Sequence, residues 1–325
     1  YKNVRYKLPA VTLSGATEGS PAEGDIWYDS GKFYLGTSQS FSGAWSSGGN
    51  LATARRDLAG AGTQSAGLCA GGDSGGSYVG TTEEYNGTAW SSGGSLITGH
   101  AELGGCGTQT AGLVMGGTPS ASDEDTEEYD GSSWSTGGDL ASGRNRLAAC
   151  GTQTAGLCMG GAHGGSVSNV TEEYNGTAWS SGGNLGTARQ TLAGAGTQTA
   201  GLCMGGSTDP TRQVATEEYD GTSWSAGGNI ATATHSLAGA GTPSAGLCMG
   251  GDTASGYSNV TEEYNGTAWS SGGNLATARS RLAGAGTQAL GLCMGGNTGS
   301  VSNVTEEYTG DYGSYDELFT AEQGL

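Results

Sequence analysis

The stretch Thr261-Glu-Glu-Tyr-Asn-Gly-Thr-Ala-Trp-Ser270 decides the fold, because close copies of it occur throughout the chain. The tyrosine of Glu-Glu-Tyr, the tryptophan of Trp-Ser and an upstream Gly-Gly pair recur every 44 or 45 residues. The tyrosines are Tyr85, Tyr129, Tyr174, Tyr219, Tyr264 and Tyr308. The tryptophans are Trp45, Trp90, Trp134, Trp179, Trp224 and Trp269. A repeat of this length, made of β-forming residues and glycine turns, is typical of propeller blades.

One repeat unit divides into four short strands. Small residues at 192–196 are followed by an apolar stretch at 201–205 that ends on the double glycine. Thr-Glu-Glu-Tyr at 216–219 and Ser-Trp-Ser at 223–225 follow, joined by Asp-Gly at 220–221. Asp-Gly and Asn-Gly favour tight hairpins because both positions tolerate positive φ. Four antiparallel strands suit a blade that packs between two neighbours, so we expect an all-β propeller.

We call the residues that recur in each unit the repeat marks. They resemble the kelch repeat, whose signature is a double glycine, a Tyr, a Trp and a downstream Arg. One unit carries them as Gly250-Gly251, Tyr264, Trp269 and Arg279. The arginine recurs at Arg55, Arg144 and Arg189, and His100 and Thr234 replace it. The resemblance covers about residues 41–308 and implies a kelch-like β-propeller. The short Tyr–Trp spacing departs from the family pattern and indicates a tighter turn.

The number of marks predicts six blades and a particular closure. The last unit stops after Tyr308 without a tryptophan, whereas Trp45 precedes the first double glycine. We therefore expect the strand at 41–46 to complete the last of six four-stranded antiparallel blades. Such a closure removes an exposed sheet edge that would invite aggregation.

Both ends of the chain lie outside the repeat. Residues 1–40 contain a predicted aromatic-rich β-hairpin at 24–36, which resembles short segments of bacteriophage tail-fibre proteins; it is interpreted as a docking element or a small β-element packed on the propeller. Residues 309–325 are acidic and lack the pattern, so we expect a tail or linker. Because the chain begins at Tyr1 rather than methionine, we expect processing or truncation.

Composition excludes several classes of function. The net charge of −19 argues against a nucleic-acid partner, since phosphate contacts need Lys and Arg. No apolar run approaches 18 residues, so we expect no membrane insertion and no signal peptide. Five of the seven cysteines share one repeat position, where a sixth unit has Val114, which indicates small buried slots with free thiols. Cys150 and Cys158 are the pair that could face each other across a hairpin.

The paired glutamates recur in every unit, so we interpret them as structural, with one Glu of each pair bonding the arginine mark or backbone amides. Catalysis needs two different environments at one place rather than one pair repeated around a ring. His100, His163 and His235 lie at unrelated repeat positions, so we expect no metal site, no cofactor and no catalytic residue. Six Asn-x-Thr sequons, at Asn86, Asn169, Asn175, Asn259, Asn265 and Asn303, are interpreted as turn and strand residues rather than glycan carriers.

Sequence variation is concentrated between the second and third strands. These loops are at 73–81, 118–125, 162–170, 207–215, 252–260 and 297–304. We expect them on one face, beside the blade crossings, where variation on a rigid scaffold often serves binding; drift in tolerant loops is the alternative. The candidate binding residues are Tyr78, Asp123, Glu124, Asp125, His163, Arg212 and Tyr257.

The amino-acid composition of the repeats, which is rich in Ala, Gly, Thr and Ser, is similar to that of kelch-like proteins of marine bacteriophages. This resemblance implies a non-enzymatic virion protein, of tail-fibre or decoration type, that binds other virion proteins and a host surface glycan or protein. The expected location is therefore the virion. The alternatives are a secreted or cell-surface bacterial adhesin of lectin type and a kelch-like enzyme.

Overall fold

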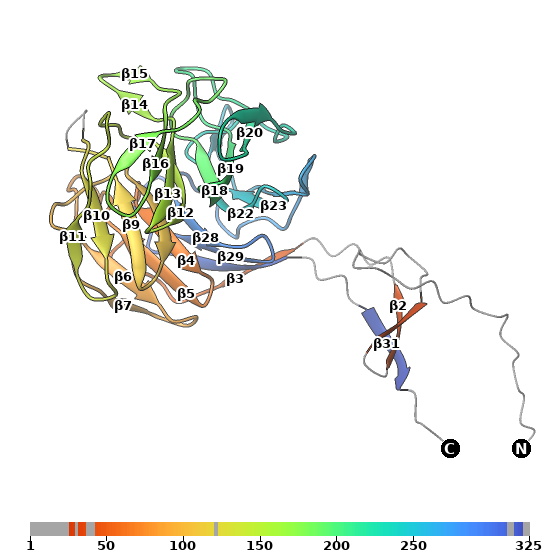
Figure 1. Ribbon diagram of the computed structural model, residues 1–325. Helices are drawn as coiled ribbons and strands as arrows, with labels where there is room; N and C mark the ends of the chain where they lie inside the picture. The colour runs from red at the N-terminus through yellow and green to blue at the C-terminus, as the bar shows by residue number, and fades with distance from the viewer. Residues whose placement is uncertain (1–25, 30–31, 37–42, 120–122, 311–314, 321–325) are drawn as a thin grey trace, which may run out of the picture. The chain divides into compact units, whose positions relative to one another are not determined.

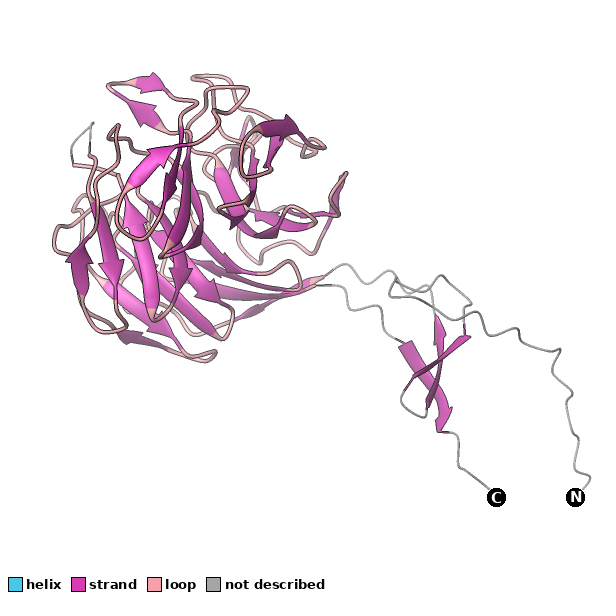
Figure 2. Ribbon diagram, viewed as in Figure 1, coloured by secondary structure: helices cyan, strands magenta, loops and turns pink. Residues whose placement is uncertain are grey.

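A computed structural model describes residues 26–29, 32–36, 43–119, 123–310 and 315–320. These residues form strands and loops without a helix, as Figure 2 shows. Accordingly, the described part of the chain offers no helix with the length and apolarity to span a membrane. The chain divides into two compact units, Gly43–Gly310 and a second unit that contains both ends.

The larger unit is a β-propeller of six four-stranded antiparallel blades (Figure 1). Blade 1 contains β4 (Ala59–Thr63), β5 (Ala66–Ala70), β6 (Thr82–Tyr85) and β7 (Trp90–Ser92). Blade 2 contains β8 (Gly104–Thr108), β9 (Ala111–Met115), β10 (Thr126–Tyr129) and β11 (Trp134–Thr136). Blade 3 contains β12 (Ala148–Thr152), β13 (Ala155–Met159), β16 (Thr171–Tyr174) and β17 (Trp179–Ser181).

Blades 4 to 6 repeat this order. Blade 4 contains β18 (Ala193–Thr197), β19 (Ala200–Met204), β20 (Thr216–Tyr219) and β21 (Trp224–Ala226). Blade 5 contains β22 (Ala238–Thr242), β23 (Ala245–Met249), β26 (Thr261–Tyr264) and β27 (Trp269–Ser271). Blade 6 contains β28 (Ala283–Gly286), β29 (Leu290–Met294), β30 (Thr305–Thr309) and β3 (Ala44–Ser47). Two short hairpins, β14–β15 (Ala162–His163 and Ser166–Val167) and β24–β25 (Asp252–Thr253 and Gly256–Tyr257), lie in the loops of blades 3 and 5.

The predicted closure is confirmed. Strand β3 pairs antiparallel with β30, with Trp45 opposite Tyr308 and Ser46 opposite Glu307. The same Tyr–Trp register holds between the third and fourth strands of the other blades, for example Tyr174 opposite Trp179. The predicted strand at 41–46 differs in its bounds, because residues 41–42 lie outside the described residues and the strand continues to Ser47.

Small residues allow the first strands of neighbouring blades to approach closely. A Cβ added at Gly60 would lie 2.8 Å from the carbonyl oxygen of Gly284, and one added at Gly239 would lie 2.8 Å from that of Gly194. Backbone contacts of this kind exclude a side chain. The alternation of alanine and glycine in these strands therefore sets how tightly the blades pack around the axis.

The marks that define the repeat join each blade to the one before it. Each tyrosine packs on the tryptophan of its own blade, with ring centroids 4.9 Å apart for Tyr174 and Trp179. The Tyr174 hydroxyl donates to Glu128 of blade 2 at 2.6 Å and accepts the Gly138 amide at 3.2 Å. The Trp179 indole N–H donates to the hydroxyl of Thr126 at 2.9 Å. Equivalent tyrosine bonds join every blade to its predecessor, including Tyr85 in blade 1 to Glu307 in blade 6.

A glutamine in the first turn adds a further contact between blades, with one exception. Gln198 donates to the carbonyls of Gly156 and Tyr174 at 3.0 and 2.6 Å. Gln64, Gln109, Gln153 and Gln288 make the equivalent pairs. Blade 5 has Pro243 at this position, and among the described residues no side chain donates to the corresponding carbonyls of blade 4.

The structure confirms the expectations of free, buried cysteines and of a turn role for Asn175. All seven cysteines are free and buried. Cys150 pairs with Leu157 and Cys158 with Ala149, so the two thiols are offset by one residue on opposite faces of the hairpin and form no disulfide. Asn175 accepts hydrogen bonds from the amides of Thr177 and Ala178, which is the turn role expected for the sequons.

The second unit contains a three-stranded sheet. Strands β1 (Ile26–Asp29) and β2 (Lys32–Gly36) pair antiparallel within the region of the predicted hairpin. Strand β31 (Tyr315–Thr320) pairs with the other edge of β2. The segment 309–325, expected to be a tail or linker, therefore contributes Thr309 to β30 and residues 315–320 to this sheet. The edge of β2 that faces away from β1 provides the backbone hydrogen-bond partners for β31.

Strand β3 is the only described fourth strand that no short turn tethers to its partner, since its blade is completed across the two ends of the chain. We expect Trp45→Ala to lower the free energy of unfolding by more than Trp179→Ala, whose loss should be about 3–5 kcal/mol. The measurement is urea unfolding of both variants. Equal losses would show that β3 does not act as a latch.

Pro243→Gln should restore the missing contact between blades 4 and 5. Two hydrogen bonds to backbone carbonyls, less the entropy that proline saves in the unfolded chain, give an expected gain of about 1 kcal/mol. The reverse change, Gln198→Pro, is the matched control and should destabilise. Denaturant unfolding measures both, and a Pro243→Gln variant less stable than wild type would contradict the role of the glutamine.

Candidate ligand-binding face

The variable loops lie on the same face as the blade crossings, as expected. Each loop begins with a residue that bridges to the segment just before the first strand of its own blade. The bridged pairs are Arg56–Asp73, Ala101–Thr118, Asn145–Ala162, Gln190–Ser207, His235–Asp252 and Ser280–Asn297. The loops are therefore held against the crossings by backbone contacts.

At the centre of this face, one residue from each blade forms a ring that we call the collar. The collar residues are Asp57, Glu102, Arg146, Thr191, Ser236 and Arg281. The amide of each donates to the carbonyl of the collar residue in the preceding blade, at 2.8 to 2.9 Å, and the ring closes from Asp57 to Arg281. All six have φ between 53° and 57°, a left-handed conformation that is costly for non-glycine residues. This strain is retained because the ring fixes the position of every collar residue.

Two hollows adjoin the collar. One, of about 100 Å³, lies between the collar and six leucines that follow it in sequence. The other, of about 370 Å³, extends from the collar over blades 4 and 5, where Gln190, Ser207, Arg212 and His235 contribute to its wall. Small-ligand sites are usually preformed hollows in which a small number of convergent polar groups fix the orientation of the ligand.

The collar carries two carboxylates and two guanidinium groups. Arg281 lies 3.3 Å from the Asp57 carboxylate, and Arg146 lies 3.0 Å from that of Glu102. Burial raises the pKa of Asp57 to about 6, with the neighbouring Glu102 adding to the shift and Arg281 opposing it. The collar can therefore change its charge near neutral pH and offers both donors and acceptors to a polar ligand.

Two residues before a collar residue, four blades carry the repeated arginine, and each arginine is held by the same set of acceptors in its own blade. In blade 4, Arg189 donates to Glu217 at 2.7 Å, to the Cys203 sulfur at 3.1 Å, and to the carbonyls of Gly205 and Ala215 at 3.0 and 2.6 Å. Arg55, Arg144 and Arg279 likewise bond the first glutamate of the pair in their blades. This confirms the structural role expected for one Glu of the pair in these four blades; in blades 2 and 5 the corresponding glutamates accept backbone amides from Ile97 and Ala231.

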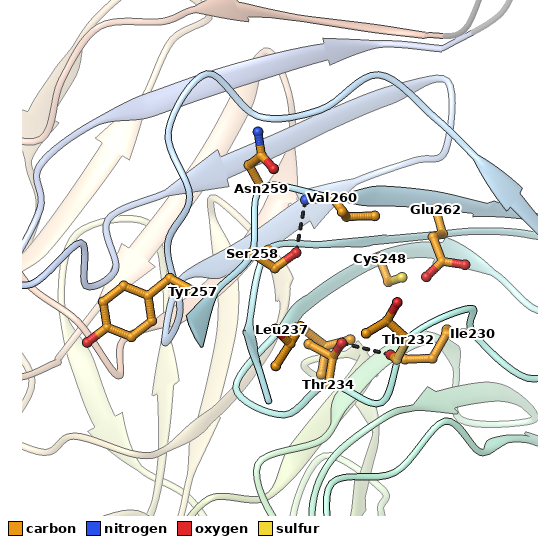
Figure 3. Close-up of a pocket in the computed structure, with 12 residues that line it drawn as sticks. Ile230, Thr232, Thr234, Leu237, Cys248, Tyr257, Ser258, Asn259, Val260 and Glu262 are labelled. Carbon is orange, nitrogen blue, oxygen red and sulfur yellow. Dashed lines mark hydrogen bonds between the residues drawn. The ribbon is translucent and has the colours of Figure 1, made fainter. Parts of the chain in front are cut away.

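Blade 5 lacks the arginine and contains a cavity at that place. Thr234 replaces the arginine, and a cavity of about 280 Å³ extends beside it (Figure 3). Glu262 and Cys248 lie close together at one end of the cavity, and Tyr257 lies farther out. Burial raises the pKa of Glu262, which the Ala231 amide partly offsets.

In blade 2 a histidine occupies the arginine position. His100 Nδ1 lies 3.2 Å from the Gly116 carbonyl and 3.6 Å from Asp123. His100, Asp123 and Asp125 could together hold a cation, because their ligand atoms lie within 4.8 Å of one another. Burial raises the pKa of Asp123. Neither this convergence nor a metal site was expected from the sequence, because His100 is distant in sequence from the acidic run.

The other candidate residues are spread over the face. Tyr78 is 49% exposed, and Glu124 is exposed beside the acidic cluster. His163 is exposed, with its Nδ1 2.7 Å from the carbonyl of Gly143.

Arg212 and Tyr257 line different hollows. Arg212 lies 3.1 Å from Asp252 and forms part of the wall of the hollow above the collar. Tyr257 lines the cavity of blade 5, and its hydroxyl accepts a hydrogen bond from Asn297. The structure thus brings together subsets of the predicted residues rather than one site.

Sequence reasoning missed the collar itself. Each collar residue stands two positions after the arginine mark and directly before a leucine that is the same in every unit, as in Arg55-Arg56-Asp57-Leu58. A position that varies between units, although it lies between the arginine mark and a constant leucine, is a signal that could have identified the collar.

Comparison with known proteins identifies the fold. No family model matches the chain, and no curated protein matches it. The solved structure of YjhT is similar with a TM-score of 0.67 and 13% sequence identity, over 81% of this chain and 96% of that one. At this identity the similarity establishes the propeller fold.

The raised pKa of Asp57 should appear in the stability of the protein. Protonation stabilises the folded state, because the folded pKa is about 6 and the ordinary value is 3.8. This stabilisation is complete below about pH 4 and is lost as the pH rises through about 6. Asp57→Asn, which suits a left-handed φ, should therefore exceed wild type by about 1–3 kcal/mol above pH 7 and match it below pH 4. Urea unfolding across this range measures the difference; a difference independent of pH would contradict the assignment.

Proposed function

We propose that this chain is a non-enzymatic binding protein that uses the collar and the loops around it to hold a surface glycan or protein. The observation that carries the proposal is the convergence of charged and polar side chains from all six blades over preformed hollows. A ring of backbone hydrogen bonds fixes their positions, so little ordering is needed on binding.

The chemistry of the collar favours a glycan. Arg146 and Arg281 can donate paired hydrogen bonds to hydroxyl or carboxylate oxygens, and Asp57 and Glu102 can accept from sugar hydroxyls. Tyr257 and Tyr78, which are 40% and 49% exposed, offer aromatic surface with a polar end in the surrounding loops.

We propose a virion as the setting, with the chain as a kelch-type tail-fibre or decoration protein. The support is the resemblance of the repeats to kelch-like bacteriophage proteins and of the segment 24–36 to tail-fibre segments. The small sheet β1–β2–β31 would then dock on other virion proteins. The net charge of −19 supports a role without a nucleic-acid partner.

Two other functions would also use this face. A secreted or cell-surface adhesin of lectin type would use the same face, and antibody labelling of intact virus particles distinguishes it from a virion protein. A kelch-like enzyme is favoured by the position of Asp57 beside Glu102 in the collar, where burial raises the pKa of Asp57 to about 6, because carboxyl groups that titrate near the working pH suit acid–base catalysis.

A glycan array probed with the full chain tests the binding role. We expect selective binding to a subset of glycans and a loss of roughly tenfold or more in the double variant Arg146→Ala/Arg281→Ala, since each charge-assisted hydrogen bond contributes about 1.5–3 kcal/mol.

The matched control is Thr177→Ala, an exposed change in the turn between β16 and β17 at the opposite end of the blade. It should bind as wild type does. Unchanged glycan binding by the double variant would remove the collar from the site, and absence of any glycan or host-protein binding would contradict the proposal.

A further inference from the structure

The propeller contains four copies of a guanidinium site that its own arginines fill. In blades 1, 3, 4 and 6 the arginine Nη2 lies 3.1, 2.7, 2.7 and 2.6 Å from the buried glutamate. The Nη1 atom donates to the carbonyl two residues before that glutamate, at 2.6 to 2.9 Å. These arginines are fully buried. The same set of acceptors therefore binds a guanidinium group in all four blades.

Blade 5 keeps the acceptors but not the arginine. Glu262, the sulfur of Cys248 and the carbonyls of Gly250 and Val260 stand where the other blades contact the guanidinium group. Thr234 is too short to reach them, and its hydroxyl donates instead to the carbonyl of Thr232 at 2.8 Å.

The Glu262 carboxylate has only the Ala231 amide as a hydrogen-bond donor among the described residues, at 3.2 and 2.9 Å to its two oxygens. The glutamate is 6% exposed. A buried carboxylate without a counter-ion is costly, so a cation that enters the cavity recovers this free energy.

The cavity is accessible from solvent. Val260 and Tyr257, at its margin, are 42% and 40% exposed. Its volume of about 280 Å³ exceeds the space that one planar guanidinium group needs. Blade 2 differs, because the His100 ring lies at the arginine position and its Nδ1 is 3.2 Å from the Gly116 carbonyl.

We propose that the blade 5 cavity binds a guanidinium group supplied from outside the chain, either as free arginine or as an arginine side chain of a partner polypeptide. A planar fork with five donors can reach the carboxylate, the sulfur and both carbonyls at once. An ammonium group, which is a compact point charge, reaches fewer of them. The site does not depend on the proposed role of the collar.

Calorimetric titration of the full chain with methylguanidinium chloride, against a matched sodium chloride blank, tests the proposal. We expect one saturable site, with methylammonium binding roughly tenfold or more weakly because it leaves charge-assisted contacts unmade. Free L-arginine and a capped Gly-Arg-Gly peptide distinguish the two sources. Tighter binding of L-arginine would indicate the free amino acid as the ligand, and tighter binding of the peptide would indicate a partner polypeptide. Binding of either one supports recognition of a guanidinium group.

Three variants make the result specific. Glu262→Gln should weaken methylguanidinium binding roughly tenfold or more. Thr234→Arg, which installs the residue of the other blades, should abolish binding and raise the Tm. Pro243→Gln, a stabilising change at the opposite end of blade 5, should bind as wild type does and so separates occupancy from stability. Absence of a saturable site in wild type, or equal binding by Thr234→Arg, would overturn the proposal.

Discussion

The hydrogen bond from the tyrosine of one blade to the second glutamate of the preceding blade is the contact on which the rest of the structure depends. It explains why Glu-Glu-Tyr is constant: the first glutamate faces the interior of its own blade, the second receives the neighbour's tyrosine, and the tyrosine reaches back. Burial and the glutamate together raise the pKa of Tyr85 to about 12, so the hydroxyl keeps its proton as a donor. Six such bonds close only in a ring.

Both proposed binding sites lie where the blades depart from the repeat. Blades that share nearly all their contacts differ at the collar and at the arginine mark, both of which face the loops. His100 and Thr234 each release a buried glutamate from its usual cation, with different results: blade 2 gains an acidic cluster around the histidine, and blade 5 gains a cavity. A symmetric scaffold tolerates these changes because each blade is anchored independently by its tyrosine, tryptophan and threonine.

Much of this architecture could be predicted from the sequence. The repeat period predicted the number of blades. The last unit lacks a tryptophan after Tyr308, whereas Trp45 at the start of the repeat has no Glu-Glu-Tyr before it, so the two residues were expected to share one blade. The glutamate–arginine pairs were also predictable, since two opposite charges recurred in register. By contrast, the repeat shows that the collar position varies, but only the closed ring shows that these residues, 44 or 45 apart in sequence, meet at one axis. The pairing of β31 with β2, and the meeting of His100 with Asp123, depend on contacts that no local pattern marks.

The central claim is that the two ends of the propeller sequence share one blade. Native-state amide hydrogen exchange along β30, compared with β20 in blade 4, tests it without altering the protein. If β3 covers the edge of β30, the amides of the two strands should be protected to a similar degree. Exchange in β30 at the rate of an exposed edge strand, while β20 stays protected, would contradict the closed ring.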